Sequence, residues 1–172
     1  MHLTPSRRTF HRLSLAGLAQ LSLALRPAWA AEDAPFDLIT AAEAQRDATE
    51  PVPPRTRAML GPASAAQAMA PTIMIIAPDM ASSPLSSPLR IEVAFKAQPD
   101  AHIVPSTFRL LYGVLKIDLT ERVNKRATIR ESGVVVDQAR VPDGTHRLIV
   151  RVGDDKGRFG EREMLIRVGA PR

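Results

Sequence analysis

The chain has 172 residues, of which 45% are hydrophobic, 24% are charged and 15 are prolines. This length suits one modest domain with extensions and is too short for two large domains. No apolar run reaches the roughly 20 residues that a membrane-spanning helix needs. Because the chain contains no cysteine, disulfides, thiolate metal sites and cysteine nucleophiles are excluded.

The net charge of +5 would favour nucleic-acid binding if it were spread over the whole fold. Four arginines and no acidic residue lie within the first 30 residues, however, and the rest of the chain is nearly neutral. The excess charge therefore belongs to one short segment. We expect no nucleic-acid partner.

Residues 1–30 have the order of a bacterial signal peptide. A basic stretch with Arg7 and Arg8 precedes the uncharged run 13–25, and the small residues Ala28 and Ala30 precede an acidic stretch. The apolar run is too short to remain as a stable membrane span. The pattern predicts signal-peptidase cleavage after Ala30, export to the periplasm and no membrane span in the mature chain.

The route of export is indicated by the string Ser-Arg-Arg-Thr-Phe at residues 6–10. Arg7, Arg8 and Phe10 make it resemble the twin-arginine export signal. The general secretion route and an uncleaved amphipathic anchor remain as alternatives. Twin-arginine export often accompanies a bound cofactor, but nothing in the mature chain indicates one, and we expect no cofactor.

Residues 31–70 are rich in alanine, proline and charged residues and hold too few large apolar residues to form a core. The segment is predicted to be a mostly disordered tether. One exception is a short helix over 41–48, which a capping box of Thr40 and Glu43 would begin. Prolines from residue 51 onward would end it.

An isolated apolar cluster, Phe36, Leu38 and Ile39, lies within this tether. Such a cluster can act as a peptide that docks on a partner. It can equally pack against the surface of its own domain, as isolated apolar clusters usually do. The sequence leaves both interpretations open.

Residues 71–168 contain short alternating apolar runs separated by proline, glycine and aspartate, which is strand periodicity. The expected strands are 72–76, 89–95, 108–112, 116–119, 127–130, 134–136, 148–152 and 164–168. About seven short strands without a strong helical pattern predict an all-β fold with two packed sheets. The turn at 153–158 predicts a hairpin between the last two strands, and residues 169–172 would form a tail.

Three stretches of this region resemble bacterial immunoglobulin-like domains. They are Val-Pro-Asp-Gly-Thr-His-Arg-Leu at 141–148, Asp-Asp-Lys-Gly-Arg at 154–158 and Pro-Ser-Thr-Phe-Arg-Leu at 105–110. The resemblance covers about residues 71–168. It implies an immunoglobulin-like β-sandwich and says almost nothing about function.

Catalytic chemistry has little support in the sequence. His102 and His146 lack a second ligand at metal spacing, and the serines at 82–87 have neither a glycine frame nor a histidine partner. No phosphate loop, metalloprotease helix or catalytic carboxylate pair is present. We expect a protein that is not an enzyme.

Metal and glycan binding are distant alternatives. Asp154 and Asp155 could bind calcium, but the turn lacks further oxygen donors. Met74 and Met80 suggest copper only weakly. The single tryptophan, Trp29, lies in the leader, so no indole is left in the mature chain to stack on sugars.

The last two expected strands carry an arginine stripe formed by Arg147, Arg151 and Arg167, with Arg162 nearby. If the apolar residues of these strands face inward, the arginines share the outer face. They could form cross-strand ion pairs with the neighbouring glutamates, or a docking face for an acidic partner.

Together these patterns predict an exported, non-enzymatic binding or structural module of the periplasm. The expected partner is another periplasmic or cell-envelope protein. The main alternative is an accessory subunit that docks on a periplasmic enzyme and stabilises it. An exposed, unpaired edge strand would favour partner binding.

Overall fold

The computed structural model describes residues 34–51, 68–79 and 84–169. Within them the strands are β1 (Phe36–Asp37), β2 (Thr72–Ala77), β3 (Leu89–Lys96), β4 (Ile103–Tyr112), β5 (Ile117–Asp118), β6 (Gly133–Arg140), β7 (Gly144–Asp154) and β8 (Phe159–Val168). The helices are α1 (Ala41–Thr49) and α3 (Thr120–Asn124).

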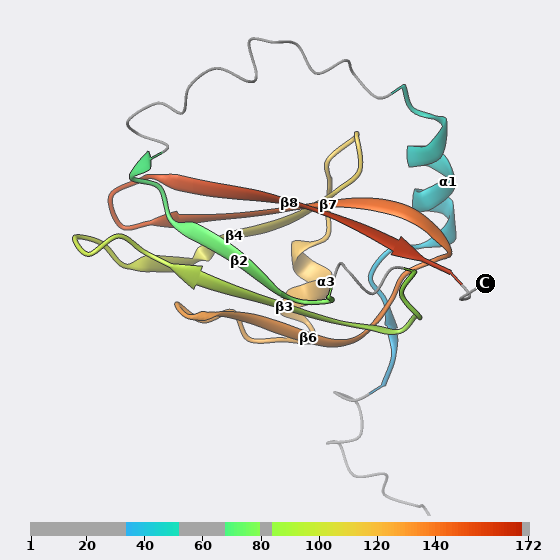
Figure 1. The fold of residues 1–172 in the computed structure, drawn as a ribbon, viewed down its shortest axis with the longest axis horizontal. Coiled ribbons are helices and arrows are strands. Elements are labelled where there is room, and N and C mark those ends of the chain that lie inside the picture. The colour runs from blue at the N-terminus through green and yellow to red at the C-terminus, as the bar shows by residue number, and fades with distance from the viewer. Residues whose placement is uncertain (1–33, 52–67, 80–83, 170–172) are drawn as a thin grey trace, which may run out of the picture.

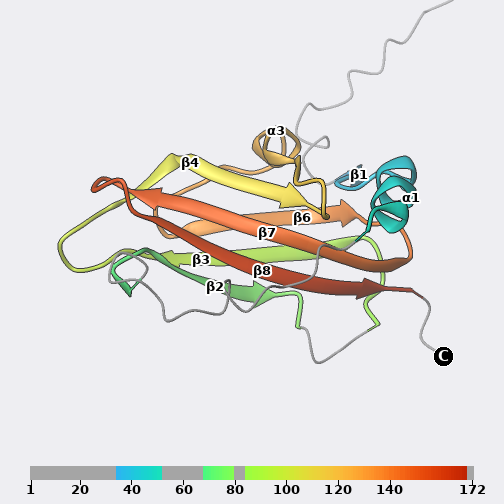
Figure 2. The same cartoon turned by 90° about the horizontal axis from the view of Figure 1, so that it is seen from above.

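Two four-stranded sheets form the two layers of the fold (Figure 1). One has the order β1-β6-β3-β2 and the other the order β5-β4-β7-β8. The view from above shows β4, β7 and β8 lying over β6, β3 and β2 (Figure 2). The prediction of a mostly β fold with two packed sheets is therefore confirmed, and β2 to β8 are the seven strands among the described residues of 71–168.

The core lies between the sheets because apolar residues alternate along each strand. In β3, Leu89, Ile91, Val93 and Phe95 are all buried, as the alternation predicts. The facing sheet contributes fully buried residues, and these include Leu148, Val150, Val152, Met164 and Ile166. Side chains from both sheets thus belong to a single hydrophobic cluster.

The hairpin predicted at the end of the chain is present. β7 and β8 pair in regular antiparallel register from Gly144 opposite Val168 to Gly153 opposite Phe159. Gly157 has a φ of 74° in the turn, which glycine adopts without steric cost.

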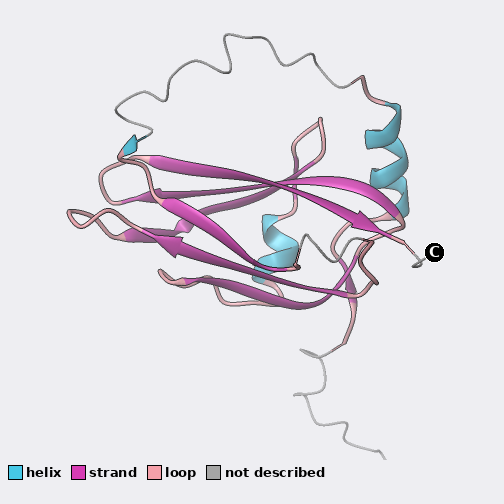
Figure 3. Ribbon diagram, in the orientation of Figure 1, coloured by secondary structure: helices cyan, strands magenta, loops and turns pink. Residues whose placement is uncertain are grey.

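The strand predicted at 127–130 is wrong. These residues instead form an irregular loop that follows α3 (cyan in Figure 3), and only Arg130 makes a single bridge, to Gly133. The helix begins because the Asp118 carboxylate accepts the backbone N–H of Thr120 at 2.8 Å. The Thr120 hydroxyl in turn accepts the N–H of Leu110 at 3.1 Å, which attaches the helix to β4.

The cluster of Phe36, Leu38 and Ile39 is part of the domain and not an exposed docking peptide. β1 pairs in parallel with β6, with Phe36 opposite Ala139, and the three apolar residues are 9%, 0% and 2% exposed. Burying these side chains against their own domain removes them from contact with any partner. Residues 34–51 are therefore not a tether, and residues 52–67 lie outside the described residues.

The predicted helix is confirmed as α1, at Ala41–Thr49. The Thr40 hydroxyl accepts the N–H of Glu43 at 3.2 Å, and the Glu43 carboxylate accepts the N–H of Thr40 at 2.9 Å. This reciprocal capping box satisfies two N–H groups that would otherwise lack partners at the helix start.

Candidate functional site

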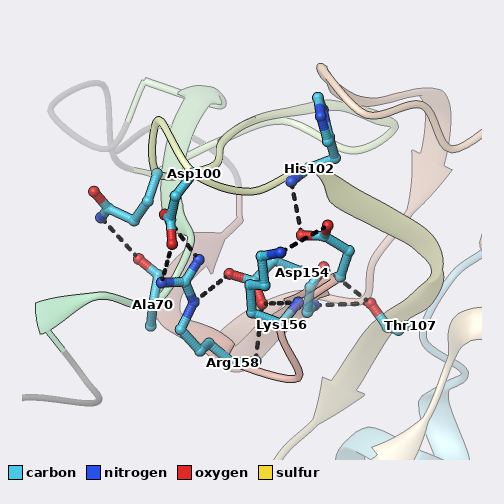
Figure 4. Close-up of polar contacts among 10 residues, drawn as sticks. Ala70, Asp100, His102, Thr107, Asp154, Lys156 and Arg158 are labelled. Atoms are coloured by element: carbon cyan, nitrogen blue, oxygen red, sulfur yellow. Dashed lines mark hydrogen bonds and ion pairs between the residues drawn. The ribbon is translucent and has the colours of Figure 1, made fainter.

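A dense polar cluster surrounds the β7–β8 turn (Figure 4). The side chain of Asp154 is fully buried there. Its Oδ1 accepts the backbone N–H groups of Lys156 at 3.0 Å and Arg158 at 2.9 Å, and its Oδ2 accepts Nε–H of Arg158 at 2.7 Å. Both carboxylate oxygens are therefore occupied by donors of the turn itself.

The same cluster fastens the turn to the start of β4. Arg158 also pairs with Asp100 at 3.2 Å, and Asp155 accepts the N–H of His102 at 3.0 Å. The Thr107 hydroxyl accepts the N–H of Gly153 at 2.8 Å. His102 thus contributes its backbone to the cluster.

The electrostatics of the cluster favour charged carboxylates with their present partners. Burial alone would raise the pKa of Asp154, but the hydrogen bonds from Arg158 and Lys156 outweigh burial and lower that pKa. The hydrogen bond from Arg158 likewise lowers the pKa of Asp100. Among the described residues, no group of three or more His, Asp or Glu side chains could hold a metal ion. The cluster stabilises the conformation of the turn, and we assign it no ligand.

His146 lies in a second polar cluster, inside the core. It is only 3% exposed, its Nε2 donates to the Pro142 carbonyl at 2.9 Å, and its Nδ1 accepts from the Tyr112 hydroxyl at 3.0 Å. A carbonyl only accepts, which fixes these ring roles. Burial, together with the nearby carboxylates of Asp47 and Glu43, raises the pKa of Tyr112 to about 12. The prediction that His146 is structural is consistent with this full pairing.

The predicted arginine stripe is divided between several partners. Arg147 pairs with Glu163 at 2.8 Å, and the guanidinium of Arg151 lies 4.4 Å from the ring centre of Phe159. Arg167 is exposed on the same outer face. At Arg147 the structure thus has the cross-strand ion pair that was one of the two alternatives, and partial neutralisation weakens this face as an acidic-partner site.

Arg162 does not belong to this face. It lies directly opposite Val150, which is fully buried and faces the core. Because directly opposed residues of an antiparallel pair project to the same side, Arg162 lies on the inward-facing side of β8. It remains exposed because β8 is at the edge of its sheet.

Sequence reasoning missed how α1 is held on the domain. Glu43 forms a bidentate pair with Arg122, at 2.7 and 2.8 Å, and Arg122 also donates to the Leu38 carbonyl at 2.8 Å. Asp47 accepts the N–H of Val114 at 2.6 Å. These partners lie about 70 to 85 residues apart in sequence, and no local pattern indicates such pairs.

An uncharged edge strand is the feature that most resembles a binding surface. β2 has the sequence Thr-Ile-Met-Ile-Ile-Ala between Pro71 and Pro78 and pairs with β3 on one side. Within the described part of the chain, no strand pairs with its other edge. Ile73 is buried, whereas Met74 and Ile76 are 43% and 55% exposed. An open edge with apolar side chains and no charge can pair with another chain.

The sequence predicts a strand at 72–76 but does not predict that this strand lies at an open edge of the sheet. The available signal was the absence of any charged residue in six consecutive strand residues. Several other predicted functional residues lie outside the described residues; these are Arg7, Arg8, Phe10, Ala28, Ala30 and Met80.

Comparison with known proteins gave no family model, no curated protein and no solved structure that matches the chain. In the part of the chain that the structure describes, neither helix is long and apolar enough to cross a bilayer.

The pair of Glu43 and Arg122 predicts a pH-dependent stability. The hydrogen bond from Arg122 lowers the pKa of Glu43 from 4.5 to about 2. The pair therefore contributes fully above pH 4.5, and its contribution is lost as the pH falls from 4.5 through 2. We expect Glu43→Gln to lower the free energy of unfolding by about 2 kcal/mol at pH 7. The difference from the unsubstituted chain should nearly vanish at pH 2 in chemical denaturation.

The matched control for this prediction is Glu121→Gln in α3. The Glu121 side chain is 90% exposed and 3.9 Å from Lys125, so its replacement should change stability little at either pH. If Glu43→Gln lowered the free energy of unfolding by the same amount at pH 7 and at pH 2, the assigned role of the carboxylate charge would be wrong.

Proposed function

We propose that this chain is an exported, non-enzymatic immunoglobulin-like module that binds another protein of the bacterial periplasm or cell envelope. The observation that carries the proposal is the open, uncharged edge of β2, with Met74 and Ile76 exposed. Main-chain pairing along such an edge supplies affinity, and alternate side chains supply specificity.

The strand order supports the immunoglobulin-like class. In those domains strands A, B, E and D form one sheet, and strands C, F and G, with C′ in some members, form the other. The order β2-β3-β6 fits A-B-E, and β5-β4-β7-β8 fits C′-C-F-G. β1 occupies the place of strand D, but it runs parallel to β6 and comes from the N-terminal side of the domain.

His146 gives independent support for the same class. Many immunoglobulin-like domains have a tyrosine near the start of strand F whose hydroxyl bonds to the backbone a few residues upstream. His146 lies near the start of β7, the strand that corresponds to F, and bonds to the Pro142 carbonyl four residues upstream. We infer that this histidine makes the hydrogen bond to the upstream backbone that a tyrosine makes in those domains.

Export is supported by the basic, apolar and small-residue order of residues 1–30. The proposal places the mature module in the periplasm after cleavage behind Ala30. The twin-arginine-like string with Arg7, Arg8 and Phe10 makes that pathway the proposed route.

The accessory-subunit alternative changes in one respect. Phe36, Leu38 and Ile39 could not serve as its docking peptide, because these residues are buried in the domain. The open edge of β2 is then the surface through which we propose that an accessory subunit docks.

A charge placed on the open edge tests the proposal. Ile76→Lys should leave folding intact, because the side chain is already 55% exposed, and should abolish partner capture, because a lysine on an edge strand blocks strand addition. Capture is measured by crosslinking in the native periplasm followed by mass spectrometry.

Leu165→Lys is the matched control for this experiment. Leu165 is 52% exposed on the edge strand of the other sheet, and the β8 edge is partly covered by Leu85, which pairs with Val168. We expect this variant to capture the same partner as the unsubstituted chain. Loss of the partner in both variants, or in neither, would refute binding through β2.

A further inference from the structure

A polar groove lies beside the outer face of the sheet that contains β3 and β6. Its volume is about 460 Å³, and it runs between these strands and the loop that follows α3. Ala94, Gly133 and Val135 contribute the strand side, and residues 124–130 contribute the loop side. Small-molecule sites in proteins have volumes of this size.

The groove carries an excess of positive charge. Its lining contains Lys125, Arg126 and Arg130 but a single acidic residue, Glu92. The Glu92 carboxylate is already engaged by Arg90, at 3.0 Å. Lys125 lies 3.9 Å from the exposed Glu121 carboxylate, which is outside the lining, so Arg130 is the main cation available to a ligand. A concave surface with one dominant sign of charge concentrates ions of the opposite sign.

Several hydrogen-bonding side chains along the groove are not used by the protein. Within the described structure, the side chains of Asn124, Thr128, Arg130 and Ser132 form no hydrogen bond or ion pair with other residues. All four are exposed. A single ligand can therefore accept from several of them without breaking an existing contact.

The loop is held firmly against the strands. Arg130 and Gly133 exchange backbone hydrogen bonds of 2.9 and 3.1 Å, and the Ser132 carbonyl accepts the N–H of Phe95 at 3.0 Å. Gly133 has a φ of 145°, and a side chain there would collide with the Val93 carbonyl. Only glycine permits this close approach, so the backbone that carries these side chains is fixed before a ligand arrives.

We propose that the groove binds a small organic anion. Its carboxylate or phosphate group contacts Arg130 and Lys125, and its apolar part lies on Ala94 and Val135. None of the groove's lining residues belongs to β2, although Ala94 lies directly opposite Met74 on the same face of the sheet. The proposal does not depend on the proposed partner binding.

The test is an amide-resolved NMR titration of the mature chain with benzoate, phenyl phosphate and neutral benzamide. We expect saturable shifts at Thr128, Ser132 and Gly133 with at least one anion, and none with benzamide at the same concentrations. Arg130→Ala should weaken anion binding about tenfold or more, because a charge-assisted hydrogen bond is lost.

Arg162→Ala is the matched control, since Arg162 is an exposed arginine of β8 outside the groove. It should leave the affinity unchanged, and both variants should keep the melting temperature of the unsubstituted chain. Preference for benzoate or for phenyl phosphate identifies the anionic group. Benzamide binding as tightly as the anions, equal weakening by both variants, or shifts scattered over all basic residues would each overturn the proposal.

Discussion

Val150→Asp is expected to unfold the domain. Val150 is fully buried at the centre of β7, between the two sheets. An aspartate at this position would bury a carboxylate without a partner and would also lose the apolar contacts of the valine. We expect a loss of at least about 4 kcal/mol, a large part of the stability of a domain of this size. Circular dichroism and thermal unfolding measure this loss.

The neighbouring substitution Arg151→Glu is the control for Val150→Asp. Arg151 lies on the outer face and contacts the exposed ring of Phe159. Loss of this cation–π contact should cost only about 1 kcal/mol. Equal melting temperatures for the two variants would show that the inward and outward faces of β7 are assigned wrongly.

Leu38→Ala is expected to destabilise the domain by about 2–5 kcal/mol. Leu38 is fully buried although it precedes the first strand of the 71–168 region by more than 30 residues. The substitution would leave a cavity in the shared core. If Leu38 lay in a disordered tether, the same substitution would leave no cavity. Denaturant unfolding of the variant and the unsubstituted chain measures the effect.

Asp37→Ala tests whether that loss is specific to buried side chains. The Asp37 side chain is 63% exposed and 4.0 Å from Arg140, so its removal should change stability by less than about 1 kcal/mol. If Leu38→Ala were as mild as this control, residues 34–51 would not be part of the folded unit in solution.

The strands of the domain could be predicted because local alternation determines them. Along β3 the residues that alternate in sequence also alternate in burial, and the glycine-containing turn at 153–158 joins β7 to β8. In β7, Leu148, Val150 and Val152 are buried as alternation predicts, although Ile149 on the outer face is buried as well. The capping box of α1 is likewise a pattern within four residues. Features of this kind need no information about distant parts of the chain.

Features that depend on distant residues could not be predicted. Composition made residues 34–51 resemble a tether, because a strand of two residues carries no periodicity and its partner, β6, lies far along the sequence. The error at 127–130 has a local cause instead, because the apolar pattern of this run fits a strand although the residues form the irregular loop after α3.

The candidate site was predicted less well than the fold. Alternation correctly places Arg147, Arg151 and Arg167 on one face, and it also places Arg162 on the inward side with Met164 and Ile166. Only its nearness in sequence groups Arg162 with the stripe. Whether an edge strand such as β2 stays open depends on where every other segment lies. That information is in the tertiary structure and not in any short stretch of sequence.

The pairing of β1 with β6 also constrains the order of folding. Phe36 pairs with Ala139, about a hundred residues later, so one of the first described segments docks only after most of the chain is available. Contacts of such long range form slowly, because the loop must close before they stabilise anything. While the chain is synthesised from its N-terminus, Leu38 and Ile39 would stay exposed until the residues of β6 have been made. During that interval, chaperones and proteases would compete for the same residues that later complete the core.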